Sequence, residues 1–117
     1  HVVASSNLYG GSITQLDVTL RRFGVETTFV ASDQADDYAA AIIPGRTKVL
    51  FAETIANPSG DIADLEALAD VARAHEVPFI VDSTIATPYL CRPIEWGADV
   101  VTHSATKFLG GHGTTLG

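Results

Sequence analysis

The chain has 117 residues, of which 46% are hydrophobic and 18% are charged, so it can bury the core of one domain. Its net charge is −7, with 14 acidic residues against 7 basic ones, which argues against a nucleic-acid partner because such surfaces need clustered Lys and Arg. The single cysteine, Cys91, excludes an internal disulfide. The apolar runs are far shorter than the roughly 20 residues that cross a bilayer, so we expect no membrane partner and a cytoplasmic protein.

Apolar, β-branched runs predict strands, and apolar residues at helical spacing predict helices. The expected strands lie at 1–5, 27–31, 48–53, 78–82 and 99–103. The expected helices are one capped by Ser12 that runs to about Phe23, a short one capped by Asp33 or Asp36 that runs to about Ile43, and one capped by Asp61 that runs from Ile62 to about His75. We also expect a turn-rich loop at 54–60 and, before the last strand, a loop with one helical turn near 94–96. This alternation predicts an α/β fold, with a mainly parallel sheet covered by helices on both faces.

Ligands bind outside the carboxyl ends of the strands in such sheets. Polar residues follow all five expected strand ends, at 5–11, 31–33, 53–57, 82–84 and 103–107. We therefore expect these five segments to meet at one site.

Two charged residues at these ends could carry chemistry. Lys107 is one of only two lysines and lies in HSATKFLGGHG just past a strand, where a partly neutral amine could attack an aldehyde. The alternative is a surface lysine on a loop. Asp82 ends the apolar run PFIVD and should need a cationic partner such as a protonated ring nitrogen. Alternatively, it caps the following turn.

Four further residues could complete a ligand site or simply satisfy loop backbone and packing. Ser104 and Thr106 could reach one small anion. Tyr9 in LYGGS could present a flat ring, and Asn57 in ETIANPSG could donate to a ligand oxygen. An aldehyde for Lys107, a ring nitrogen for Asp82, a phosphate for the hydroxyls and a ring face for Tyr9 describe one ligand, pyridoxal 5′-phosphate.

The blocks VDSTIATPYL and HSATKFLGGHG, with LYGGS and ETIANPSG before them, resemble the Cys/Met-metabolism enzymes that use pyridoxal phosphate. The resemblance implies an aspartate-aminotransferase-like fold of type I. Because the chain begins with His1 instead of Met and stops at Gly117, we expect residues 1–117 to be part of the large cofactor-binding domain, with an N-terminal segment and a C-terminal domain outside the chain.

The resemblance also implies roles for the six residues. Lys107 looks like the Schiff-base lysine, and Asp82 looks like the partner of the pyridine nitrogen. Ser104 and Thr106 look like phosphate ligands. Tyr9 looks like the stacking tyrosine that also helps proton transfer, and Asn57 looks like the residue beside the phenolic oxygen of the cofactor.

Within the family, TPYLCRPIEWGAD and GGHGTTLG are most similar to O-acetylhomoserine sulfhydrylases. This resemblance implies a transferase of trans-sulfuration and methionine biosynthesis that replaces the acetate of O-acetyl-L-homoserine by sulfide to give homocysteine. Cystathionine γ-synthase and γ-lyase are the alternatives within the family. The resemblance also implies a homo-oligomer, a dimer of dimers, whose neighbouring subunit completes the phosphate site.

Functions of other classes have less support in the sequence. The chain has no GxGxxG and no GxxxxGK[ST], which argues against a nucleotide-binding module. It has no HExxH and no close cluster of acidic residues and histidines, so we expect no metal site. A non-catalytic fragment stays open, because family residues that bind phosphate and substrate carboxylate lie outside the chain, and we expect the isolated chain to have little activity.

Overall fold

The computed structural model describes residues 1–117 and has one sheet of five parallel strands in the order β2-β1-β3-β4-β5. The strands are β1 (Val2–Ser5), β2 (Thr27–Val30), β3 (Val49–Glu53), β4 (Phe79–Asp82) and β5 (Val100–Thr102). Because all pairings are parallel, the carboxyl ends of the strands lie on the same edge of the sheet. The predicted α/β architecture with a parallel sheet is confirmed.

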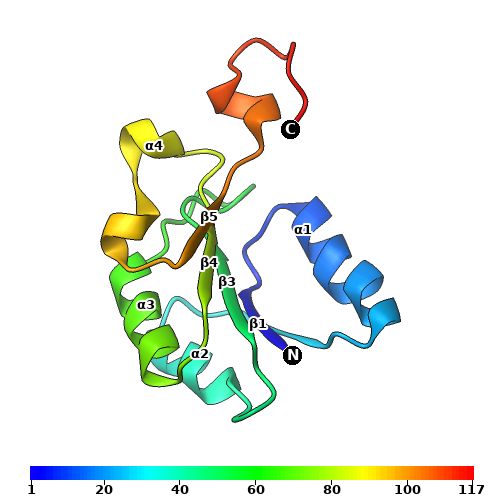
Figure 1. Ribbon diagram of the computed structural model, residues 1–117, viewed down its shortest axis with the longest axis vertical. Coiled ribbons are helices and arrows are strands. Elements are labelled where there is room, and N and C mark those ends of the chain that lie inside the picture. The colour runs from blue at the N-terminus through cyan, green and yellow to red at the C-terminus, as the bar shows by residue number, and fades with distance from the viewer.

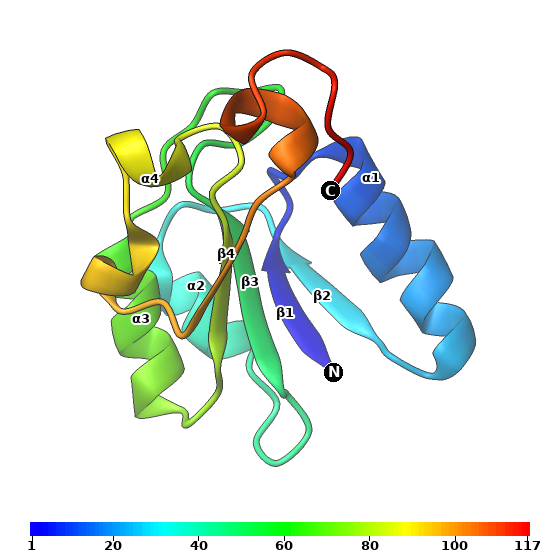
Figure 2. The ribbon, with the colours of Figure 1, turned by 45° about the horizontal axis from the view of Figure 1, so that its top comes forward.

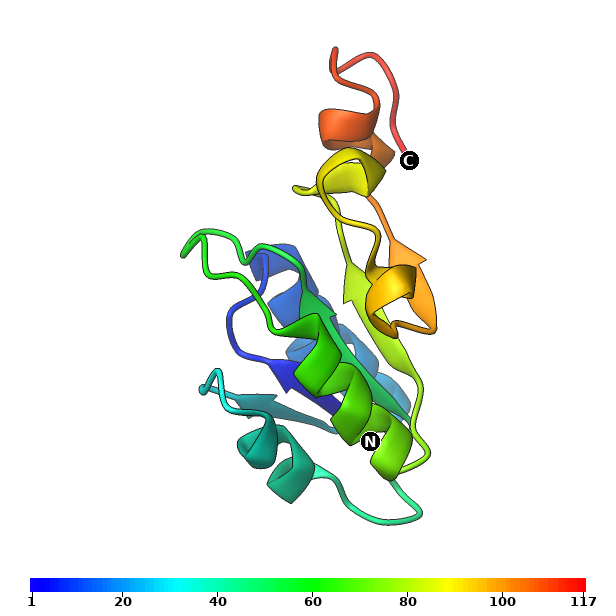
Figure 3. The same ribbon diagram turned by 90° about the vertical axis from the view of Figure 1, so that its left-hand side faces the viewer.

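Helices cover both faces of this sheet (Figure 1). On one face lie α2 (Ala35–Ala41) and α3 (Leu65–Ala74), which pack on the larger core. On the other face lies α1 (Gly10–Thr14), which continues through a π turn (Gln15–Thr19) and a 3-10 turn (Leu20–Phe23). Figure 3 shows α3 and the helix that starts with α1 on opposite sides of the strands.

The larger core explains why the central strands are apolar throughout. Leu50, Phe79 and Val81 are fully buried between the sheet and the two helices. The smaller core on the opposite face joins Val2 and Ala4 of β1 to the α1 side of the molecule. Burial on both faces is the usual state of a parallel strand, so the strands show no alternation of apolar and polar residues.

The helix expected from Ile62 begins later than predicted. Its N-cap is Asp64, whose side chain accepts a hydrogen bond from the backbone N–H of Ala67 at 3.0 Å. Ile62 instead forms an antiparallel bridge with Ile55, so the preceding segment is extended and Asp61 cannot cap the helix. The predicted cap and start were therefore wrong, by three residues each.

The other helices differ from the prediction in smaller ways. The helix expected to be capped by Ser12 begins at Gly10, with Tyr9 at the N-cap and no side-chain cap, so that cap prediction was wrong. Gln34 is the N-cap residue of α2 and no side chain caps that helix, so neither predicted aspartate does so. The segment expected to be a loop contains α4 (Thr87–Leu90), because a proline in the first helical turn needs no N–H donor. The helical turn near 94–96 is present as a 3-10 turn (Pro93–Trp96), and a π turn (Ala105–Leu109) follows β5.

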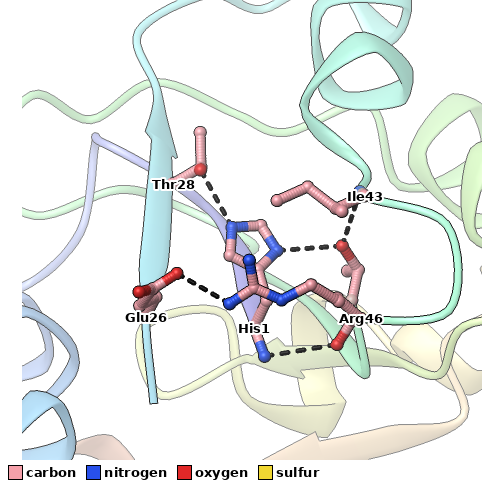
Figure 4. Close-up of polar contacts among 6 residues, drawn as sticks. His1, Glu26, Thr28, Ile43 and Arg46 are labelled. Atoms are coloured by element: carbon pink, nitrogen blue, oxygen red, sulfur yellow. Dashed lines mark hydrogen bonds and ion pairs between the residues drawn. The ribbon is translucent and has the colours of Figure 1, made fainter. Parts of the chain in front are cut away.

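Side chains at the amino ends of the strands join neighbouring elements (Figure 4). The His1 ring contacts Thr47 Oγ1 through Nδ1 and Thr28 Oγ1 through Nε2, each at 2.9 Å. Arg46 pairs with Glu26 at 2.9 Å on the surface, where such a pair adds little stability. These contacts connect β1 to the strands on either side. They lie at the edge of the sheet opposite the carboxyl ends of the strands.

None of the helices is both long and apolar enough to cross a membrane.

Candidate active site

A cleft of about 380 Å³ opens at the carboxyl ends of the strands. Figure 2 shows the loops that follow β3, β4 and β5 gathered above the sheet, near the start of α1. All six residues that the sequence singled out line this cleft: Tyr9, Asn57, Asp82, Ser104, Thr106 and Lys107. The structure therefore brings together residues that are up to 98 positions apart (107 − 9 = 98).

One of the five expected segments lies elsewhere. Residues 31–33, which follow β2, line a separate hollow with Ser5, Asn7 and Asp61. The reason is the strand order, because β2 is the edge strand and β1 separates it from β3. The expectation that all five strand ends meet at one site was wrong for β2, and the other four ends contribute to the cleft.

Asp82 is the last residue of β4 and is partly buried. One carboxylate oxygen, Oδ1, accepts a hydrogen bond from the backbone N–H of Thr84 at 2.9 Å, so the alternative role of turn capping is present. The other oxygen, Oδ2, accepts no hydrogen bond, and the carboxylate forms no ion pair. A carboxylate with one free oxygen at the base of a cleft can accept a proton or an N–H donor from a ligand.

Lys107 lies in the turn after β5, where the backbone kinks at φ −92° and ψ −126°. Its side chain is exposed to the cleft and forms no ion pair. It is the only cationic side chain that lines the cleft, which also holds two acids, Glu53 and Asp82. An amine in this position can reach a bound molecule without breaking a contact to the protein.

The two hydroxyls before Lys107 differ in what they contact. The Ser104 hydroxyl has no hydrogen-bond partner in the chain, while the backbone N–H of Ser104 donates to Thr84 Oγ1 at 2.8 Å. The Thr106 hydroxyl donates to the Gly117 carbonyl at 3.4 Å and accepts from the Gly117 N–H at 3.3 Å. Ser104 is thus free to donate to an anion, whereas Thr106 would first have to release Gly117.

Tyr9 precedes α1, and its side chain is 55% exposed. The ring lies so close to Gly11 that a Cβ atom at residue 11 would collide with ring carbon Cε1. The same atom at Gly10 would meet nothing within 4 Å. Gly11 therefore makes room for the ring of Tyr9 itself.

Glu53 also lines the cleft, and sequence reasoning gave it no role. It ends β3 beside Asp82 in the register, and only 7% of its surface is exposed. Burial raises the pKa of its carboxyl, and the nearby charge of Asp82 raises that pKa further, against the lowering effect of N–H donors from Tyr9 and Asn57. The sequence pattern that could have identified Glu53 is an acidic residue at the end of an apolar strand. The same pattern identified Asp82.

The residues of the cleft fit pyridoxal phosphate. The free Asp82 oxygen suits a ring nitrogen, the unpartnered Ser104 hydroxyl suits a phosphate oxygen, and the unpaired Lys107 amine suits an aldehyde. A metal is a weaker fit, because no group of three or more His, Cys, Asp or Glu residues is placed to hold one.

The model of the family described as "Cys/Met metabolism PLP-dependent enzyme" matches residues 1–117. The chain belongs to this family. A relative is the sulfhydrylase FUB7 of Fusarium oxysporum f. sp. lycopersici, which is 51% identical over 118 residues covering 100% of this chain and 27% of that protein. Another is the O-acetyl-L-homoserine sulfhydrylase of Corynebacterium glutamicum, 48% identical over 100% of this chain and 27% of that protein.

Solved structures of the family have the same fold. Cystathionine γ-lyase from Lactobacillus plantarum, complexed with L-serine, matches with a TM-score of 0.94 and 38% identity over 99% of this chain and 30% of that one. A putative O-acetylhomoserine (thiol)-lyase from Campylobacter jejuni with N′-pyridoxyl-lysine-5′-monophosphate matches with the same TM-score and identity over 98% of this chain and 28% of that one. The predicted family, its fold and its cofactor, pyridoxal phosphate, are confirmed. The chain spans about 27% of the length of the curated relatives.

Proposed function

We propose that the protein containing this chain replaces the acetate of O-acetyl-L-homoserine by sulfide, giving homocysteine and acetate. The observation that carries the proposal is the cleft, which places the amine of Lys107 among a free carboxylate oxygen, two hydroxyls and an exposed tyrosine. The sulfhydrylase names of relatives at 51% and 48% identity support this reaction over others of the family. In this proposal the chain is part of the cofactor-binding large domain.

Six of the residues that line the cleft would hold the cofactor. Lys107 would attach it through the amine nitrogen, and Asp82 would accept the hydrogen of the ring nitrogen at Oδ2. Ser104 would donate to a phosphate oxygen, and Thr106 would do so after releasing Gly117. Tyr9 would lie against the ring, and Asn57 would donate to the phenolic oxygen. When bound, pyridoxal phosphate supplies an aldehyde that condenses with amines and a ring that takes up the electron pair of the substrate α-carbon.

The chain's own residues would then move the protons. When not bonded to the cofactor, the Lys107 amine would be the base that takes the α-hydrogen of the substrate and returns a proton elsewhere on it. Tyr9, with its exposed phenol, is the second group that can hold a proton near the substrate. The γ-carbon loses acetate and gains the sulfur of hydrogen sulfide, so the substrates and products balance.

Elimination is the second candidate function, because the structural neighbour from Lactobacillus plantarum is a cystathionine γ-lyase. An assay of the full-length protein with O-acetyl-L-homoserine and sulfide distinguishes the two. Both reactions release acetate from O-acetyl-L-homoserine. Replacement gives homocysteine in an amount equal to the acetate, whereas elimination gives 2-oxobutyrate and ammonia instead of homocysteine. Homocysteine formation that is lost in Lys107→Ala and kept in Lys48→Ala is the expected result; 2-oxobutyrate as the main product would overturn the proposal.

The proposal extends to the assembly and location of the protein. We expect a homo-oligomer built as a dimer of dimers, since the family resemblance implies that a neighbouring subunit completes the phosphate site. The cytoplasm stays the predicted location. The isolated 117-residue chain is expected to have little activity, and efficient sulfhydrylation by this chain alone would contradict that expectation.

A further inference from the structure

Glu53 contacts the two loops that carry Tyr9 and Asn57, the candidate cofactor-binding residues in the first half of the chain. Its Oε1 accepts a hydrogen bond from the backbone N–H of Tyr9 at 2.8 Å, and its Oε2 accepts one from the backbone N–H of Asn57 at 3.3 Å. The first contact spans 44 positions in the sequence. One side chain therefore fixes the start of α1 and the loop after β3 relative to each other.

The position of Glu53 makes these contacts firm. It is the last residue of β3, it is 7% exposed, and β3 is the middle strand of the sheet. A carboxylate that accepts hydrogen bonds from N–H groups forms stronger bonds than a neutral acceptor would. Because both oxygens are used, no other side chain type of this length can satisfy both donors, and Gln can satisfy only one.

The other hydrogen-bond partners of Tyr9 are the backbone N–H groups of Ser12 and Ile13, which lie in the turn that follows and do not connect Tyr9 to β3. The side chain of Tyr9 is more than half exposed, and the short helix that follows it has no side-chain cap. The side chain of Asn57 is exposed and has no hydrogen-bond partner in the chain. Neither side chain is thus held by burial, and the bonds from Glu53 fix the backbone from which each one projects.

We propose that Glu53 is a positioning residue that sets Tyr9 and Asn57 at the wall of the cofactor cleft. It acts through two backbone N–H groups and needs no contact with the cofactor or the substrate. The proposal deepens the proposed function, since it assumes that Tyr9 and Asn57 face pyridoxal phosphate. The two acids of the cleft therefore have different roles in the proposal. Asp82 would bind the cofactor ring directly, whereas Glu53 acts through the backbone.

The first arm of the test is hydrogen–deuterium exchange in the full-length protein without cofactor. Glu53→Ala should raise the exchange rate of the segments that contain Tyr9 and Asn57 by about tenfold, as expected for a lost hydrogen bond to a charged acceptor. Glu53→Gln should raise it less. Two controls are Glu66→Ala, at an exposed glutamate on α3, and Val77→Ala, at a buried residue just before β4. Both should leave the two segments unchanged.

The second arm is titration of the same proteins with pyridoxal phosphate, followed by absorbance. Glu53→Ala should weaken cofactor binding about tenfold, Glu53→Gln should recover part of the loss, and Val77→Ala should lose stability without this change. The proposal is overturned if Glu53→Ala leaves both segments as protected as in the wild type, or binds cofactor as tightly as Val77→Ala. If the wild type binds no cofactor, the proposed function fails while the exchange arm still decides the role of Glu53.

Discussion

Thr84 joins the two loops that carry Asp82 and Lys107, because its hydroxyl oxygen accepts the backbone N–H of Ser104 at 2.8 Å. The backbone N–H of Thr84 meanwhile donates to Asp82 Oδ1 at 2.9 Å. One residue thus orients the carboxylate at the end of β4 and fixes the turn after β5. Thr84 and Glu53 together connect the loops of four strands around the cleft.

Replacement of Thr84 by valine should separate these loops. Thr84→Val keeps the shape of the side chain but leaves the Ser104 N–H without its acceptor, so cofactor affinity should fall about tenfold. Thr84→Ser keeps the hydroxyl and should bind nearly as tightly as the wild type. Titration of the full-length protein with pyridoxal phosphate measures both values, and equal affinity of the valine and serine variants would show that the contact does not matter.

Gly11 and Gly10 offer a matched pair for testing the place of the Tyr9 ring. Gly11→Ala puts a Cβ atom into the ring of Tyr9, whereas Gly10→Ala adds one in open space. We expect Gly11→Ala to weaken cofactor binding several-fold and Gly10→Ala to leave it unchanged. The same titration measures both, and a result in which the two variants behave alike would place the ring elsewhere.

The corrected start of α3 leads to a stability prediction. Asp64→Ala removes the acceptor of the Ala67 N–H and should lower the free energy of unfolding by about 1 kcal/mol. Asp61→Ala removes only an exposed hydrogen bond with Asn7, so it should change the free energy by less than about 0.5 kcal/mol. Urea unfolding of the full-length variants compares them. A larger loss for Asp61→Ala would restore the cap predicted from the sequence.

The buried carboxyl of Glu53 should make stability depend on pH. Its folded pKa is raised, so between the ordinary value of 4.5 and the folded value the native state binds more protons than the unfolded chain. Glu53 therefore contributes stability at low pH that is lost as the pH rises through the folded pKa. Asp82, Tyr9 and Asn57 are the neighbours that set this pKa, besides burial.

The matching experiment is urea unfolding of wild type and Glu53→Gln at several pH values from 4 upward. Glutamine does not titrate, so the stability of the variant minus that of the wild type should increase with pH across the window. Apart from Asp82, the one charged neighbour of Glu53, the other titratable groups have the same surroundings in both proteins and cancel in the difference. A difference that is constant or decreases with pH would contradict the raised pKa of Glu53.

The sequence was sufficient to predict the side of the fold on which the cleft lies, for a physical reason. Continuous apolar runs are typical of a parallel sheet, and a parallel sheet collects its strand ends at one edge. Polar residues such as Asp82 and Lys107 lie at or just past those ends. The strand order was not available from the sequence. The segment after β2 was therefore assigned to the cleft, although the edge position of β2 keeps it away.

Two kinds of feature could not be predicted from the sequence. One is a contact between residues far apart in the chain, and the other is a choice between two residues with equally good local patterns. Asp61 and Asp64 are both good caps, and only the bridge between Ile55 and Ile62 excludes the first. Glu53 has no local pattern that shows its bonds to Tyr9 and Asn57, because those depend on how two loops fold back over β3.

The central claim is that Lys107 is the amine that holds the cofactor, and covalent labelling tests it most directly. The full-length protein is incubated with pyridoxal phosphate, reduced with borohydride, digested and analysed by mass spectrometry. The mass of one pyridoxyl phosphate group should be found on the peptide with Lys107 and not on the peptide with Lys48. Label on a different lysine, or no label under conditions that keep the protein folded, would contradict the account.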